Sequence, residues 1–389
     1  MKTATIMPLA ALAVLAATYG AAPAMAADNV VKIGIAVALT GQLAPYEETE
    51  GARCMADKLN KAAGPNDPKV IVETADNRSD SQLSVSLAQK FLDDGDQIVA
   101  GVPYPDALIP IATMAQGYGA TVYSAPNTQV EMQEIGVDNF FAGAVPDPIN
   151  AAATAAEAYK EGARKAVLLT SEDVGSWSAK LPEWFGEAFT GWGGKVVGKF
   201  NYNFGITDWS PQIASIKALP EKPDVIHVSG ILPDIGILIR QLRANGYDGW
   251  IVGSDGFDDP SLEPTVGNPA YLDKVIFATH GLVGMGGPID EFLAQCKTEG
   301  FKVNGIFDAL GADMVMVAAA AAKKAGTTDA VKLREAMRAE GGYPGLTAPT
   351  ISFFEHKSYP VKTVPVIGFE NGKRVLLTDA MPTKIPYLK

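Results

Sequence analysis

The sequence predicts an α/β protein built from two doubly wound lobes, each around a parallel sheet. Short apolar runs rich in β-branched residues alternate with stretches of helical periodicity, which is typical of buried parallel strands and their covering helices. The alternation restarts after Pro146-Asp147-Pro148 and so forms two successive series. The 389 residues, of which 47% are hydrophobic and 20% charged, suffice for two globular domains.

The first series begins with a buried strand at Lys32, which Thr40-Gly41 ends. A helix follows and ends near Lys61. The other elements expected before the restart are strands at residues 69–75, 97–101 and 120–124 and helices at residues 81–92 and 106–116.

The second series has the same rhythm, and Asn245-Gly246 is a typical end of one of its helices. Its expected helices are residues 151–161, 177–189, 211–218 and 234–244, and its expected strands are residues 165–170, 195–198, 224–229 and 250–253.

The rest of the chain adds a strand at 274–279, a long apolar helix at 304–324 and late strands at 364–367 and 374–377. Pro365 predicts that the first late strand lies at a sheet edge, because proline donates no ladder hydrogen bond. This remainder is too short for a third core, so we expect it to complete the two lobes. A chain that crosses between lobes repeatedly forms a hinge, and ligands favour the cleft there.

The N-terminus has the pattern of an export signal. Lys2 precedes an apolar run at residues 6–17, and Ala24-Met25-Ala26 places small residues where signal peptidase cleaves. We predict that residues 1–26 are a signal peptide cleaved after Ala26 and that the mature protein is periplasmic. An uncleaved membrane anchor is the alternative, which Pro8 and Pro23 disfavour.

Charge and cysteine content exclude several classes of protein. The formal net charge of −12 disfavours nucleic acid and anionic membranes as partners. Cys54 and Cys296 each lie in a helical pattern; they either pair or pack separately, and the sequence leaves both open. No Cys-x-x-Cys or close Cys/His set predicts a metal site, and no dinucleotide, Walker or nucleophile-elbow motif predicts an enzyme.

Several motifs, taken in order, resemble those of the branched-chain amino-acid-binding proteins of ABC transporters. They are the segment from Lys32 to Tyr46 with Glu50-Gly-Ala, Asp76-Asn77, the segment from Gly230 to Gly246, and Gly253-Ser-Asp-Gly. The resemblance implies a type I periplasmic binding fold with a three-crossing hinge near residues 144–146, 279–281 and 353–355. Lobe 1 would comprise residues 27–145 plus 280–354, and lobe 2 residues 146–279 plus 355–389.

The same resemblance implies a function. The chain would be a monomer that captures a small polar solute, such as an amino acid or a related amide or amine, by hinge closure. Its partner would be an inner-membrane ABC permease complex, and no cofactor or metal is expected. A sensory receptor with the same fold remains the alternative, because the fold alone does not separate transport from signalling.

The candidate ligand-binding residues come from this resemblance and from strand-end positions. Thr128, with Asn127 beside it, matches the threonine that holds a ligand carboxylate, and Asp255 matches the acid that pairs a ligand ammonium. Tyr46 matches the aromatic of the first lobe. Each has a plainer interpretation as a turn, loop or surface residue. The remaining candidates are cleft-facing aromatic or acidic residues: Tyr104, Asp106, Trp177 and Phe307.

Departures from the family pattern bear on the ligand. Pro105 stands where the main carboxylate-binding serine is expected and offers neither hydroxyl nor N–H. Val174 and Ile231 replace two tyrosines of the second lobe, and Ser79 and Tyr104 occupy the places of an early disulfide. With Asp106 and Asp255 retained, we expect a neutral or cationic polar ligand. An aromatic compound stacked on the cleft rings is the alternative.

Overall fold

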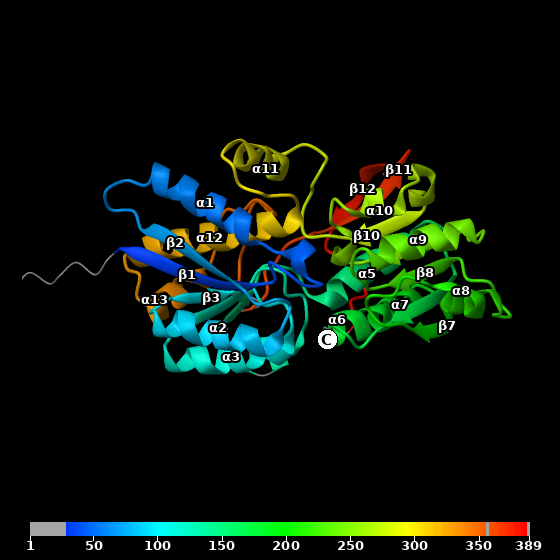
Figure 1. The fold of residues 1–389 in the computed structure, drawn as a ribbon, viewed down its shortest axis with the longest axis horizontal. Coiled ribbons are helices and arrows are strands. Elements are labelled where there is room, and N and C mark those ends of the chain that lie inside the picture. Colours follow the sequence, from blue (N-terminus) through cyan, green and yellow to red (C-terminus); the bar gives the residue numbers. More distant parts are fainter. Residues whose placement is uncertain (1–28, 135, 355–357, 387–389) are drawn as a thin grey trace, which may run out of the picture.

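The computed structural model describes residues 29–134, 136–354 and 358–386, so the predicted signal peptide at residues 1–26 lies outside the described part. Two α/β lobes lie side by side, the first blue, cyan and yellow to orange, the second mostly green and red (Figure 1). No helix in the described ranges combines the length and the apolar character that a bilayer span requires.

The first lobe is a five-stranded parallel sheet in the order β2-β1-β3-β4-β5. Its strands are β1 (Val30–Val37), β2 (Lys69–Asp76), β3 (Ile98–Ala100), β4 (Thr121–Ser124) and β5 (Phe140–Ala142). The helices are α1 (Thr49–Ala62), α2 (Ser81–Asp93), α3 (Pro105–Gly117) and α4 (Glu131–Glu134), with α11 (Pro288–Thr298), α12 (Ile306–Ala325) and α13 (Ala330–Met337) from late in the chain. A 3₁₀ helix, η1 (Ala44–Tyr46), follows β1.

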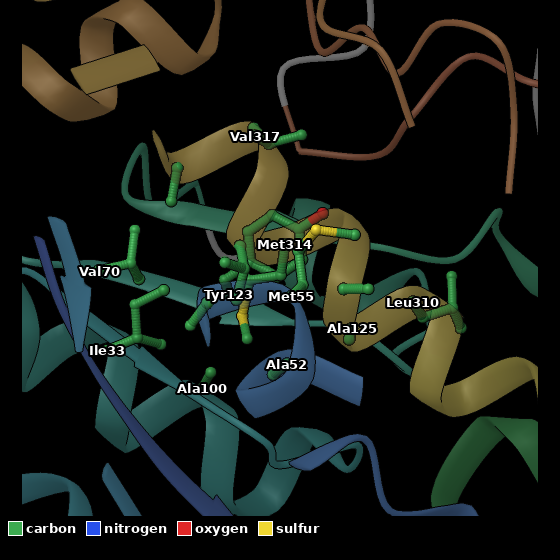
Figure 2. Packing of buried hydrophobic residues seen from close by; sticks show 14 of the residues in the cluster. Ile33, Ala52, Met55, Val70, Ala100, Tyr123, Ala125, Leu310, Met314 and Val317 are labelled. Atoms are coloured by element: carbon green, nitrogen blue, oxygen red, sulfur yellow. The ribbon is translucent and has the colours of Figure 1, made fainter. Parts of the chain in front are cut away.

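Helices cover both faces of this sheet, as the predicted doubly wound arrangement requires. Ile33 faces a core formed with α1 and α12, whereas Ala36 and Val99 face α2 and α3. Figure 2 shows the first of these cores, which includes Met55 of α1 and Met314 of α12. The chain's last helices therefore complete its first lobe.

The second lobe is a seven-stranded sheet in the order β12-β11-β10-β9-β8-β6-β7. Its strands are β6 (Lys165–Thr170), β7 (Lys195–Asn201), β8 (Val225–Val228), β9 (Trp250–Gly253), β10 (Val275–Ala278), β11 (Val364–Glu370) and β12 (Lys373–Ala380). The helices are α5 (Asp147–Lys160), α6 (Gly175–Ala179), α7 (Leu181–Gly191), α8 (Ser210–Lys217), α9 (Asp234–Ala244) and α10 (Leu262–Val266), and the 3₁₀ helices η2 (Asp255–Phe257) and η3 (Pro269–Leu272) follow β9 and α10.

The expected edge position of the strand around Pro365 is wrong. β11 lies between β10 and β12 and pairs antiparallel with both. Pro365 is tolerated because it is the second residue of the strand, its carbonyl accepts the Thr279 N–H at 3.0 Å, and the register shifts at the next two residues.

The chain changes lobe three times among the described residues. The first change lies between β5 and α5, the second between β10 and α11, and the third before β11. The third lies later than the predicted boundary at 354/355, because Ser358 accepts the Ala142 N–H at 2.7 Å and Tyr359 packs edge-on against Phe140 of the first lobe.

Cys54 of α1 and Cys296 of α11 form a disulfide, which resolves the alternative that the sequence left open. Both residues are fully buried in the core of the first lobe. The chain returns from the second lobe just before α11, and the disulfide attaches α11 to α1. The second crossing is therefore covalently anchored to the first lobe.

Candidate functional site

A cavity lies between the lobes, at the carboxyl ends of the parallel strands, and holds about 640 Å³ counting its opening to solvent. Its walls come from loops after β1, β2, β3, β4, β6, β8 and β9 and from the start of α12. The lining residues are Val37, Ala38, Leu43, Tyr46, Asn77, Gly101, Pro103, Tyr104, Pro126, Thr128, Gln129, Val174, Trp177, Ile231, Asp255, Gly256 and Phe307.

Six of the eight predicted site residues line this cavity: Tyr46, Tyr104, Thr128, Trp177, Asp255 and Phe307. Val174 and Ile231, singled out as departures from the family pattern, line it as well. The walls are largely aliphatic and aromatic, and the described lining includes no Lys or Arg. A solute with an apolar part and little net negative charge suits such walls.

Asp255 is the acidic residue of the cavity wall. It begins η2 directly after β9, and its side chain is buried. The Trp177 indole Nε1–H donates to Oδ1 at 2.8 Å, and His280 Nε2 lies 3.1 Å from Oδ2. Each carboxylate oxygen has two lone pairs, so Asp255 retains the capacity to accept a further hydrogen bond from the cavity.

Tyr46 reaches from η1 of the first lobe to the second lobe. Its hydroxyl accepts the Leu232 N–H at 2.8 Å and donates to the Gly256 carbonyl at 3.0 Å. Its ring packs edge-on against Phe307 with the ring centres 5.3 Å apart. Burial raises the pKa of the phenol well above its ordinary value, so the hydroxyl keeps its proton.

Two of the predicted site residues, Asn127 and Asp106, do not line the cavity. Asn127 is fully buried behind the wall, where its Nδ2 donates to the Pro103 carbonyl at 2.7 Å and its Oδ1 accepts from Tyr359 at 3.2 Å. Asp106 is exposed on the first turn of α3 and accepts from the Ser81 hydroxyl at 2.6 Å. Asp106 therefore contributes no charge inside the cavity.

Tyr104 is a buried part of the wall, and its hydroxyl lies 3.5 Å from the Ser84 hydroxyl. Burial raises the pKa of this phenol too. Tyr104 also borders a second, more polar groove, which shares Leu43 and Val174 with the cavity. The charged residues of this groove are Arg78, Asp106, Glu131, Glu172 and Asp173, so it is predominantly acidic.

Gln129 and Asn77 are lining residues that the sequence analysis did not select. Gln129 Nε2 donates to the Pro103 carbonyl at 3.2 Å, and its Oε1 accepts from Ser176 of the second lobe at 3.3 Å. Asn77 donates to the Ala36 carbonyl at 3.1 Å. The Asp76-Asn77 motif gave a signal for Asn77, whereas no motif pointed to Gln129.

Asp147 is a buried carboxyl close behind Thr128. Its backbone N–H donates to the Thr128 carbonyl at 2.8 Å where the chain first enters the second lobe. Burial raises its pKa well above the ordinary value, and the negative charges of Asp255 and Glu131 add to this while Thr128 opposes it. In the described ranges no group of three His, Cys, Asp or Glu residues is arranged to hold a metal ion.

The sequence profile of the family described as periplasmic binding protein matches residues 30–372. The Leu/Ile/Val-binding protein BraC3 of Rhizobium johnstonii is 28% identical over 249 residues, 64% of this chain and 66% of that protein, just under two thirds of its length. The leucine-, isoleucine-, valine-, threonine- and alanine-binding protein of Pseudomonas aeruginosa is 25% identical over 359 residues, 87% of this chain and 90% of that protein.

Solved structures have the same architecture. The leucine-binding protein LivK of Thermotoga maritima superposes with a TM-score of 0.78 at 26% identity, covering 90% of this chain and 99% of that chain. A solute-binding protein of Rhodopseudomonas palustris in complex with 3,4-dihydroxybenzoic acid has a TM-score of 0.78 at 20% identity, covering 92% and 99%, and shows the shared fold alone. The predicted fold class, a type I periplasmic binding fold, is confirmed by these neighbours.

Proposed function

This chain belongs to the periplasmic binding protein family, as its motifs predicted, and we propose that it captures an amino-acid-like solute for an ABC transporter. The solute carries an amino group and an apolar side chain and binds between the lobes, which close around it. An inner-membrane permease complex then receives it. Residues 1–26 direct export and are removed, and the mature protein acts in the periplasm.

The observation that carries this proposal is one buried carboxylate, Asp255, in an otherwise uncharged wall. A ligand ammonium placed against Asp255 supplies the positive charge that the described lining lacks. Contacts with Trp177 and His280 hold the carboxylate in place, so its orientation is set before the ligand arrives. A buried charge pair with supporting hydrogen bonds discriminates strongly against ligands that lack one partner.

The rest of the ligand follows from the remaining walls. Leu43, Val174 and Ile231 offer aliphatic surface for a side chain. Thr128 and Gln129 offer neutral polar groups to a ligand carboxylate. Relatives whose names refer to leucine, isoleucine and valine are consistent with this assignment.

Lobe closure is the proposed mechanism, and no bond is made or broken in it. The solute contacts one lobe first, bridges to the other and shifts the open–closed equilibrium by its preference for the closed state. Ser176 of the second lobe donates to Glu131 of the first at 2.8 Å, so the lobes also contact each other directly around the cavity.

Thermal unfolding of the refolded, ligand-stripped protein with matched compounds tests the proposal. A ligand at 100 times its Kd stabilises the native state by about 2.7 kcal/mol, which raises Tm measurably. We expect leucine to raise Tm, and 4-methylpentanoate, which lacks only the amino group, to leave it unchanged. A shift with the deaminated acid but none with leucine contradicts the role of Asp255.

The four rings of Tyr46, Tyr104, Trp177 and Phe307 in the wall favour one second candidate, an aromatic solute. Phenylalanine and benzoate extend the same panel to this case. If phenylalanine binds and benzoate does not, the amino group is still required and the cavity accepts an aromatic side chain. If benzoate binds and the amino acids do not, the solute is an aromatic acid and the proposal is wrong.

A further inference from the structure

We infer that Tyr46 determines the size of the solute, because its hydroxyl fixes the distance at which the two lobes close. The inference rests on the proposed function, in which the ligand lies in the interlobe cavity. It concerns the phenol oxygen, whereas the ring acts as a wall.

The hydroxyl bonds to backbone atoms only. Leu232 N–H and the Gly256 carbonyl belong to two different loops of the second lobe, after β8 and after β9. A backbone atom moves only with its loop, so these two bonds fix the position of the first lobe relative to the second. The cross-cleft bonds of Ser176 join side chains, whose rotation adapts to a different lobe separation.

Close packing holds the acceptor loop in place. A Cβ atom on Gly256 would lie 2.3 Å from the Gly230 carbonyl oxygen and 2.8 Å from the Trp177 ring, so the backbone at Gly256 lies directly against both. Trp177 in turn is hydrogen-bonded to Asp255. The Gly256 carbonyl is therefore held in place, and its hydrogen bond forms only when lobe closure brings the Tyr46 hydroxyl to it.

The Tyr46 side chain is equally constrained by its packing. The ring packs against the cores of both lobes and edge-on against Phe307, the second residue of α12. The Tyr46 side chain is rigid from ring to hydroxyl, so its length sets the distance between η1 and the second lobe and acts as a spacer. Ile231 and Gly256, which flank the two bonds, are themselves cavity walls, so the spacer sets the width available to a solute.

The two states of the cleft differ in what Tyr46 does. In the closed state the Leu232 N–H has the phenol as its acceptor; in an open state water replaces it. Removal of the hydroxyl therefore costs free energy only on closure, because the closed state then holds a buried donor without a partner. A solute too long for the cavity pays the same penalty, since it prevents the two bonds from forming.

The test compares the wild-type protein with Tyr46→Phe, which keeps the ring, over straight-chain 2-amino acids from 2-aminobutyrate to 2-aminoheptanoate. Each added methylene increases affinity by hydrophobic burial, about fourfold, until the solute exceeds the cavity. For the wild type we expect a sharp loss of affinity beyond one length. For Tyr46→Phe we expect 10- to 100-fold weaker binding of the best solute, faster dissociation, and no sharp length limit.

Ser176→Ala is the matched control, because it removes the side-chain bonds across the cleft and should keep the length limit. An unchanged limit in Tyr46→Phe overturns the inference. If no amino acid of the series binds the wild type, the proposed function fails, and the role of the Tyr46 hydroxyl is then tested by small-angle scattering of both proteins saturated with a compound of the thermal panel that does bind. A larger radius of gyration for liganded Tyr46→Phe than for liganded wild type supports the inference, and equal radii overturn it.

Discussion

Replacement of Asp255 by asparagine removes a charge from the cavity wall and leaves the shape intact. The asparagine oxygen still accepts the Trp177 indole N–H, which lies 2.8 Å from Oδ1 in the native protein. The buried position means that water replaces the lost charge poorly. Loss of one partner from a buried, hydrogen-bonded charge pair costs about 3–5 kcal/mol, and the open mouth and the nearby His280 place the expected cost at the lower end.

A cost of about 3 kcal/mol corresponds to roughly a hundredfold increase in Kd. Titration calorimetry with leucine measures it directly. The deaminated analogue 4-methylpentanoate serves as the internal control, since a ligand without an ammonium group has nothing to lose at Asp255. We expect its weak binding to stay the same or improve.

Asp106→Asn is the matched control variant. It makes the same chemical change at an exposed aspartate that lies outside the cavity, so the leucine Kd should stay within about twofold, as for other exposed charges. A less than fivefold effect of Asp255→Asn on leucine, with an unchanged melting temperature of the ligand-free protein, would refute the assignment of Asp255 as the ammonium partner.

Three further predictions concern stability. Replacement of Cys54 and Cys296 by serine should lower the free energy of unfolding in urea by about 2–4 kcal/mol and leave the leucine Kd unchanged; equal stability of the variant and the oxidised parent would contradict this. Burial raises the pKa of Asp96 to about 6, so the native protein is most stable with Asp96 protonated, and its stability declines as pH rises from about 4 through 6. Asp96→Asn should therefore be more stable than the parent at pH 7.5, by at most about 3 kcal/mol. At pH 4 the variant should be no more stable than the parent. Gly51→Ala should destabilise the first lobe by about 1–3 kcal/mol, because its Cβ would lie 1.9 Å from the Asp308 carbonyl oxygen, and an unchanged melting temperature would show that α1 and α12 can separate freely.

The sequence predicted which loops form the cavity better than it predicted which side chains enter it. Thr128 and Asn127 are neighbours on one strand-end loop, yet Thr128 lines the cavity and Asn127 is turned behind the wall to the Pro103 carbonyl. A loop has no fixed alternation of sides, in contrast to a strand, so periodicity gives no answer there. Gln129, on the same loop, was missed for this reason.

Long-range pairing set the other limits of prediction. Asp106 lies two residues after the cavity residue Tyr104, but on the first turn of α3 it accepts a hydrogen bond from Ser81 of α2. Pro365 suggested a sheet edge, and the partner strand β12 was needed to show otherwise. The pairing of Cys54 and Cys296, separated by 242 residues, likewise depends on where α11 returns. The repeated strand–helix order, by contrast, is a local signal, and the two-lobed fold followed from it.

The disulfide makes a covalent ring of most of the chain, and the whole five-stranded parallel part of the second lobe, from β6 to β10, belongs to that ring. A single proteolytic cut in any loop between Cys54 and Cys296 therefore yields two fragments that stay joined. Nicked protein should migrate as one band on a denaturing gel without reductant and as two bands with it. The disulfide therefore keeps the two walls of the cavity covalently linked after a single cut in the backbone.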